Sequence, residues 1–270
     1  MAVYRRGYQR YQGALSSRWA RLAVVPRFAW RRLSQQRLVV ALTVVAMTWP
    51  LLCALFIYLA NHAELLKGLG KEFQGLLNID GNFFLIFMTV QSFFALFLAA
   101  LAGPGLIAPD LANNALQLYF SRPLTRLDYA FGKLAALVGM LSLVTWIPGL
   151  ALFGMQAGMA GGQWFRSNWK LGAGLFAGFV LWILLVSMVA LASSAYARLK
   201  AVSGGLVLGF FFILGGAAGI INSVLRVTWG NALSPIRAAY QIWRSLLGIE
   251  PSSGPAAPSC AMVLLAIMLL

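Results

Sequence analysis

The feature of this sequence that most restricts its fold is a series of long apolar segments with almost no charged residue. An α-helix needs about 20 such residues to cross about 30 Å of hydrocarbon, and all segments but the last are close to that length. The segments lie at about 38–60, 83–102, 131–154, 171–196, 201–222 and 259–270. They are continuously apolar, whereas the strands of a membrane barrel alternate apolar and polar residues. The pattern predicts an all-α polytopic membrane protein with about six transmembrane helices, in a transmembrane domain over 38–270.

The overall composition leads to the same conclusion. Apolar residues make up 61% of the chain and charged residues 10%, against about 45–50% and about 25% in a typical soluble domain. A water-soluble chain of 270 residues could not bury that excess, so lipid is the expected solvent. The last segment would cover only about 18 Å as a helix. It is either partly inserted or continued beyond residue 270, and we expect continuation.

The net charge of +15 is concentrated at one end and in loops. Nine of the 21 basic residues precede residue 38, and most of the others lie between the apolar segments. Basic residues in such places orient a membrane protein and bind anionic headgroups, so we expect no nucleic-acid partner. The side of the predicted topology that holds both termini carries about twice as many Lys and Arg as the other. Both termini are therefore expected in the cytoplasm, with the spans in a bacterial-type inner membrane.

The basic segment 1–37 contains a helical pattern over residues 16–37. Apolar residues recur there every three or four positions, and arginines occupy most of the positions between them. The pattern predicts an amphipathic helix on the cytoplasmic membrane surface, capped by Ser16 or Ser17. The expected membrane-surface residues are Trp19, Arg21, Trp30, Arg31 and Arg32. A disordered basic tail is the alternative, and it fits residues 1–15 better than residues 16–37.

Groups that could support catalysis are scarce. The six acidic residues lie in loops or at span ends, and the single histidine, His62, follows the first span. The sequence contains no zinc-protease, serine-hydrolase or paired-cysteine metal motif. Residues 68–71 resemble the end of a phosphate-binding loop, but Glu72 stands where Ser or Thr is required. We therefore expect no enzyme activity, catalytic residue, metal or cofactor on this chain.

The loop at 103–130, between the second and third spans, is the most informative. Four helix breakers are expected to end the second span: Gly103, Pro104, Gly105 and Pro109. A short helix is expected over 110–120, ending before Pro123. Asp128 is expected in the first turn of the next helix, where its charge is favourable, and Lys133 at the membrane interface. These features fit an ordinary interfacial loop and a docking element equally well.

Around this loop the sequence resembles the membrane subunits of ABC-2 type transporters. In that family a small helix after the second span is followed by Ser-Arg-Pro, a polar stretch, an aromatic residue and Gly-Lys. The matching positions here are Ser121-Arg122-Pro123-Leu124-Thr125-Arg126, Tyr129 and Gly132-Lys133. The six spans and the amphipathic basic segment match as well. The chain departs from many relatives at 110–114, where they carry Glu-Arg-Gly, so the polar contacts of docking are expected to differ.

The resemblance implies a permease subunit that pairs with a second permease as a homodimer and binds two ABC ATPase subunits. Those partner subunits would hold ATP and magnesium. The helix at 110–120 would be the coupling helix in a cleft of the ATPase, and residues 236–247 of the extracytoplasmic loop 223–258 would form a hairpin before the last span. The expected ATPase-docking residues are Asp110, Leu116, Tyr119, Phe120, Arg122 and Pro123.

The expected function is ATP-driven export of an apolar or amphipathic substrate, because the spans carry almost no charge. No substrate-binding residue is assigned. A non-transporting membrane scaffold of an envelope machine is the main alternative. The membrane part of a lipid-modifying enzyme is a second, which the scarcity of acidic residues and histidine disfavours.

Small and polar residues within the spans predict how the helices pack. Three glycine pairs with a spacing of four permit close helix contact, within the chain or along a dimer seam on the fifth span. They are Gly174/Gly178, Gly205/Gly209 and Gly215/Gly219. Asn82, Gln91 and Ser92 are expected to join neighbouring helices rather than contact cargo. Cys53 and Cys260 are expected to be small buried side chains.

Overall fold

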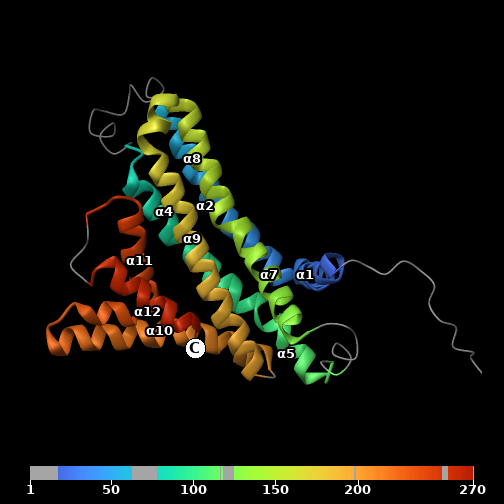
Figure 1. The fold of residues 1–270 in the computed structure, drawn as a ribbon. Helices are drawn as coiled ribbons and strands as arrows, with labels where there is room; N and C mark the ends of the chain where they lie inside the picture. Colours follow the sequence, from blue (N-terminus) through green and yellow to red (C-terminus); the bar gives the residue numbers. More distant parts are fainter. Residues whose placement is uncertain are drawn as a thin grey trace, which may run out of the picture.

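The computed structural model describes residues 18–62, 78–115, 117, 125–197, 199–250 and 255–269, with side chains from residue 23 onward. Within these ranges the fold is all-α and contains no strand, as predicted. The elements in chain order are α1 (Arg18–Ser34), α2 (Arg37–Asn61), α4 (Gly81–Ala102), α5 (Pro104–Ala112), α7 (Arg126–Val144), α8 (Trp146–Ala160), α9 (Gly162–Tyr196), α10 (Lys200–Leu225), the 3-10 helix η2 (Trp229–Leu233), α11 (Pro235–Leu246) and α12 (Ala257–Leu269) (Figure 1).

Five helical segments of the described chain are long and apolar enough to cross a membrane. They are Arg37–Asn61, Gly81–Ala112, Arg126–Ala160, Gly162–Tyr196 and Lys200–Leu225. These segments confirm five of the predicted spans by length and composition, and the protein is a multi-pass membrane protein. The sixth predicted span corresponds to α12, an apolar helix of 13 residues.

Helix α4 ends at Ala102, where the second span was expected to end, whereas α9 begins at Gly162, well before the expected start of the fourth span at 171. A second helix, α5, follows α4 at once and extends the apolar helical segment to Ala112, into the region expected to be loop. Pro104 can begin α5 because the first residues of a helix need no N–H donor. The short helix expected over 110–120 is wrong in its first part, since α5 ends at Ala112 and Asn114 has a positive φ of 51°. The rest of that expected helix lies almost entirely outside the described residues.

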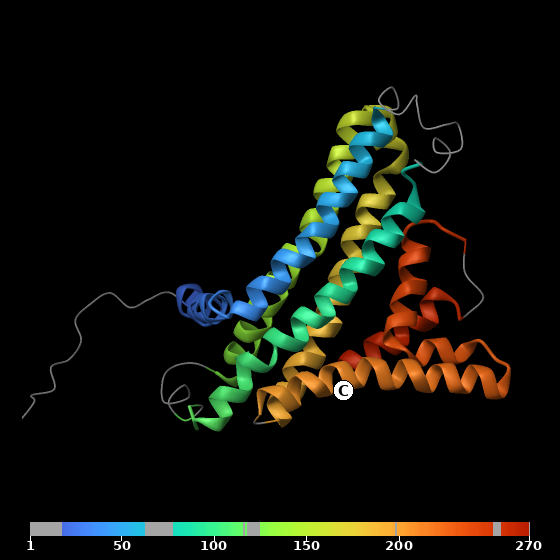
Figure 2. The ribbon, with the colours of Figure 1, turned by 180° about the vertical axis from the view of Figure 1, so that it is seen from behind.

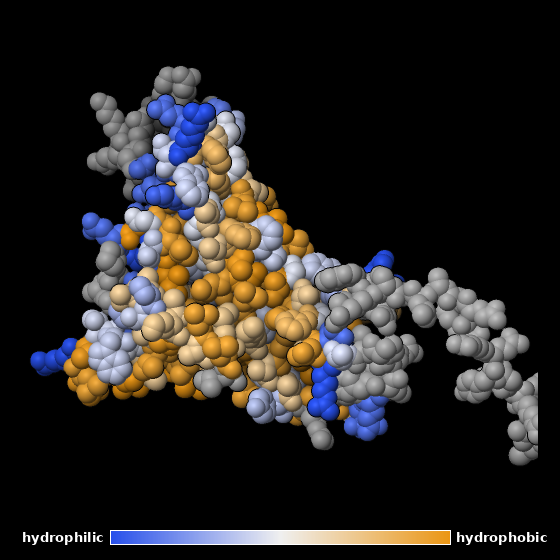
Figure 3. Space-filling view, in the orientation of Figure 1, coloured by the Kyte–Doolittle hydropathy of each residue, from blue (hydrophilic) through white to orange (hydrophobic). Residues whose placement is uncertain are grey.

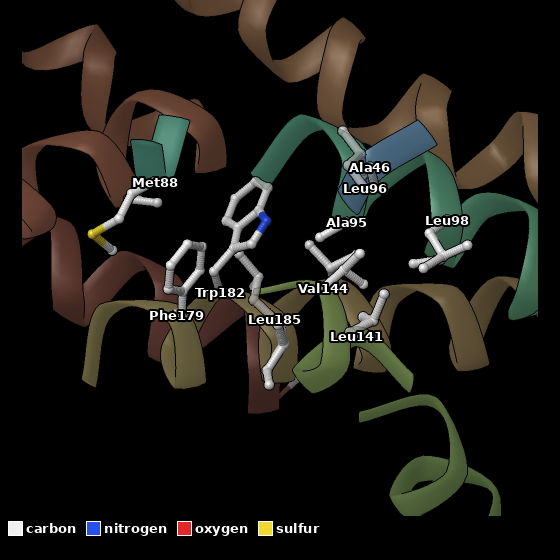
Figure 4. Packing of buried hydrophobic residues seen from close by; sticks show 14 of the residues in the cluster. Ala46, Met88, Ala95, Leu96, Leu98, Leu141, Val144, Phe179, Trp182 and Leu185 are labelled. Atoms are coloured by element: carbon white, nitrogen blue, oxygen red, sulfur yellow. The ribbon is translucent and has the colours of Figure 1, made fainter. Parts of the chain in front are cut away.

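The long helices α2, α4, α7, α8 and α9 form one tilted bundle, and α1 and α10 run crosswise to it (Figures 1 and 2). Apolar side chains cover the broad middle of the visible face, with hydrophilic residues near both ends (Figure 3). The centre of the bundle is filled by side chains from four helices, including Ala46, Leu96, Val144 and Trp182 (Figure 4).

Helix α1 confirms the predicted helix within the N-terminal segment, and it packs closely on α7. Val25, Ala29 and Leu33 are buried, while Trp30 and Arg31 are exposed. The contact depends on small residues of α7, because a Cβ on Gly132 would lie 2.7 Å from Val25. The apolar face of α1 is therefore covered in part by protein.

Residues 236–247, expected to form part of a hairpin, fall almost entirely in helix α11, which begins at Pro235 and is capped by Ser234 accepting from the N–H of Arg237. Its apolar face packs into the bundle: the Trp243 indole donates to the carbonyl of Gly178 at 3.1 Å. A Cβ on Gly174 would lie 2.5 Å from the carbonyl oxygen of Leu246. The first predicted glycine pair thus permits close contact between α9 and α11, within the chain.

Candidate functional site

A buried charged cluster lies where α5 and α7 meet, at the two ends of the loop that resembles the ABC-2 family. The Asp110 carboxylate accepts from the Lys133 ammonium and from the Tyr129 hydroxyl, each at 2.8 Å. Arg32 of α1 approaches the other carboxylate oxygen at 3.6 Å. Asp110 and Lys133 are only 6% and 5% exposed. These four residues, called the Asp110 cluster below, join three helices.

Local sequence sets the geometry of the cluster on α7. Thr125 and Asp128 form a reciprocal capping box at the start of the helix, so its first turn is fixed. The predicted place of Asp128 in that turn is confirmed. Tyr129 and Lys133 are four residues apart and therefore lie on one face of α7, toward α5. The Lys133 ammonium also donates to the carbonyl of Leu106 at 2.7 Å, one turn before Asp110 in α5.

The electrostatics of the cluster depend on burial. Two unlike charges removed from water stabilise a structure only if both are paired and hydrogen-bonded, and here both are. Removing one partner of such a pair costs about 3–5 kcal/mol, since the other charge is left buried. The Arg32 side chain is 45% exposed, and its contact with Asp110 is longer than that of Lys133. Its contribution to stability is therefore closer to that of a surface ion pair, about 0–1 kcal/mol.

A second contact fixes α5 to α9. The buried Ser194 hydroxyl accepts from the N–H of Ala108 at 3.0 Å and donates to the carbonyl of Pro104 at 3.3 Å. The hydroxyl therefore lies between two backbone groups that are four residues apart in α5. A Cβ on Gly103 would lie 2.7 Å from the Cβ of Ala190, so only glycine permits this approach of the helices.

Of the predicted docking residues, the structure describes only Asp110, and it places that carboxylate inside the protein. The others, Leu116, Tyr119, Phe120, Arg122 and Pro123, lie outside the described residues. Among the predicted membrane-surface residues, Arg32 reaches the Asp110 cluster, and Arg31 and Trp30 are exposed. Trp19 and Arg21 belong to α1, but their side chains are outside the described part.

Sequence reasoning missed the roles of Tyr129, Lys133 and Ser194 as partners of α5. Tyr129 and Lys133 were recognised only as parts of a motif, and Lys133 as an interface anchor. A usable signal was present, because an aspartate close to an apolar segment needs a compensating cation. Lys133 on the next helix is such a cation, and Tyr129, four residues earlier, lies on the same face of that helix. No comparable sequence signal points to Ser194.

An apolar groove includes residues from the first turns of α7, but none of the four residues of the Asp110 cluster lines it. It has a volume of about 1120 Å³ and is lined by α7, α9, α10, η2 and α12. It extends from Leu127 and Phe131, at the start of α7, to Val263 and Met268 of α12. Ser193 is the one polar side chain among the described residues that line it. The described residues contain no group of His, Cys, Asp and Glu that could hold a metal ion.

Comparison with known proteins gives no assignment: no family model matches the chain, and no curated protein is significantly similar to it.

Proposed function

We propose that this protein is the membrane subunit of an ATP-driven transporter of the ABC-2 type, with its 110–123 segment docking on a separate ATPase. The supporting observation is the Asp110 cluster. It joins the two helix ends from which the proposed docking loop extends, and its Asp110, Tyr129 and Lys133 side chains are buried and hydrogen-bonded to one another. A loop anchored in this way can transmit a displacement to the membrane helices instead of deforming locally.

In this proposal Asp110 is a positioning residue, not a contact for the ATPase. Its bonds to Tyr129 and Lys133 make α5 and α7 move together. Ser194 carries the same displacement to α9, and Arg32 carries it to α1. Closure of the ATPase would thus move α1, α5, α7 and the cytoplasmic end of α9 as one unit.

The proposed cargo is apolar or amphipathic. The groove between α7, α9, α10 and α12 has an apolar lining, and part of that lining comes from α7, the helix that carries Tyr129 and Lys133. Export follows from the proposed cytoplasmic position of the loop and of both termini, in a bacterial-type inner membrane. A second copy of this chain and two ATPases would complete the transporter.

Co-purification tests the proposal. The tagged protein, extracted in mild detergent from its native membrane, is expected to bring down an ABC-type ATPase in equal copy number. Arg122→Glu combined with Leu116→Asp should remove the ATPase while the protein stays folded. Arg166→Glu, which changes a basic residue at the α8–α9 end of the bundle, is the matched control and should retain the ATPase. An intact membrane complex without an ATPase would favour the scaffold function instead.

A further inference from the structure

Two prolines, one inside α2 and one just beyond the end of α7, each lie four residues after a carbonyl that has no helical donor. Pro50 lies inside α2, and Pro148 lies in the first turn of α8, directly after α7. Proline has no N–H, so the carbonyl four residues earlier loses its usual hydrogen bond. The two carbonyls concerned are those of Ala46 and Val144. In the apolar centre of a membrane such a group must find another donor.

One side chain supplies both donors. Gln91 of α4 is fully buried, and its amide nitrogen donates to the carbonyl of Ala46 at 3.1 Å and to the carbonyl of Val144. A glutamine amide has two N–H groups, so its donor capacity is used completely. Ala46 and Val144 lie on different helices close to α4 residues such as Ala95 (Figure 4).

The arrangement is specific to the two prolines. Among the carbonyls of α2 and α7, Gln91 bonds to the two that lie four residues before a proline. Its own Oε1 is buried and has no hydrogen-bond partner among the described residues, which is a cost. That cost is offset only because two other buried groups are paired. An apolar side chain at position 91 would leave both carbonyls without a hydrogen-bond donor.

We propose that Gln91 is a pivot that couples the Pro50 region of α2 to the junction between α7 and α8 at Thr145. Because both bonds come from one rigid amide, a displacement of one helix at its bond moves the amide and alters the other bond. Helices α2 and α8 are also joined at the C-terminal end of α2, where the Asn61 amide donates to the Gln156 side chain at 2.7 Å. The pivot does not depend on the proposed transport function, and a scaffold protein would contain it equally.

A mutant cycle tests the bonding, using thermal unfolding of the full-length protein in detergent. Gln91→Leu is expected to lower the Tm by several degrees. In a Pro50→Ala, Pro148→Ala background residues 50 and 148 each have an N–H that can donate to these carbonyls, so the same change is expected to lower the Tm by less than half as much. Gln156→Leu, which removes the bond to Asn61, is the control, and its cost should be equal in both backgrounds.

An equal cost of Gln91→Leu in both backgrounds would overturn the proposal, as would no cost at all. If the double proline variant does not fold, Pro148→Ala alone gives the same test for the Val144 bond. In that case the cost of Gln91→Leu should fall by a smaller but measurable amount, and an unchanged cost would again count against the pivot.

A distance measurement tests the coupling itself. Spin labels at the exposed residues Leu38 and Tyr58 lie on either side of Pro50 in α2, and the native cysteines are replaced by alanine. With Gln91 present, Pro148→Ala is expected to shift the mean distance between the labels, although it alters a different helix. In the Gln91→Leu background the same change should cause no shift. A shift that is the same in both backgrounds, or absent from both, would contradict the pivot.

Discussion

Helices α4–α5 and α10 have similar apolar compositions but very different surroundings. In the most apolar part of Gly81–Ala112, 61% of the residues are buried, compared with 17% in Lys200–Leu225. The difference lies in specific contacts. The segment Gly81–Ala112 holds Gln91, Gly103 and Asp110, each with a close or bonded neighbour. On α10, Gly205 has no neighbour within 4 Å of a Cβ, and Gly205 and Gly209 line the open groove. Apolar composition brings a helix into the membrane, whereas polar and small residues determine what it packs against.

The largest effect is expected at the Asp110 cluster. Asp110→Ala leaves the Lys133 ammonium buried without its partner, and should lower the free energy of unfolding by about 3–5 kcal/mol. Denaturant unfolding of the purified protein in detergent measures this loss. Adding Lys133→Met removes the uncompensated charge, so the double variant should be more stable than Asp110→Ala. A double variant that is less stable than the single one would show that the two charges do not form a pair.

Glycine positions on the two kinds of helix offer a matched comparison. Gly178→Leu should lower the free energy of unfolding by about 1–3 kcal/mol, because a Cβ there would lie 2.7 Å from Trp243 and Met88. Gly205→Leu on α10 meets open space and should cost little in the same unfolding assay. Equal costs at the two positions would mean that Gly205 is packed as tightly as Gly178.

An effect of similar size is expected from the loss of a single indole hydrogen bond. The Trp182 indole donates to the carbonyl of Ser92 at 3.2 Å inside the bundle. Trp182→Phe removes that donor and part of the ring, and should lower the free energy of unfolding by about 1–3 kcal/mol. Trp229→Phe in η2, where the ring is 54% exposed, is the control, with a change within about 0.5 kcal/mol. A loss at Trp229 as large as that at Trp182 would contradict the contrast in burial.

The smallest effect on stability is expected on the exposed face of α10. Ile213 is 72% exposed, so Ile213→Ala should change the free energy of unfolding by no more than about 0.5 kcal/mol. If this face forms the proposed dimer seam, the same change should weaken the dimer, as measured by light scattering in detergent. Unchanged dimerisation would place the seam elsewhere.

The spans and several helix ends could be predicted from the sequence because they depend on local features. Segment length and apolar content locate the long helices, Pro235 marks the start of α11, and Thr125 with Asp128 fixes the start of α7. The continuation of α4 into α5 was missed, because two glycines and two prolines normally end a helix. Contacts with α9 support the extension, including the bond from Ser194 to Ala108.

The site was harder to predict than the fold because it depends on tertiary contacts. The family-like motif correctly drew attention to the loop, yet Asp110, expected on a docking surface, is buried against Lys133. The crosswise orientation of α10 could not be predicted from the sequence either. An apolar helix of 26 residues has the composition of a transmembrane span whatever its orientation in the fold. Gln91 was expected to join helices, and its bonds to α2 and α7 confirm this. The two prolines four residues beyond its acceptors are a signal that the sequence does contain.

The central claim is that the loop between α5 and α7 binds a nucleotide-hydrolysing subunit in the cytoplasm. Photo-crosslinking in native membranes, from a reactive amino acid placed at Gln117, tests it most directly. Trp169 is exposed at the α8–α9 end of the bundle and serves as the control position. The account predicts a covalent adduct with an ATPase from position 117 and none from position 169. The opposite pattern, or labelling of position 117 by a membrane-impermeant reagent added outside the cell, would contradict it.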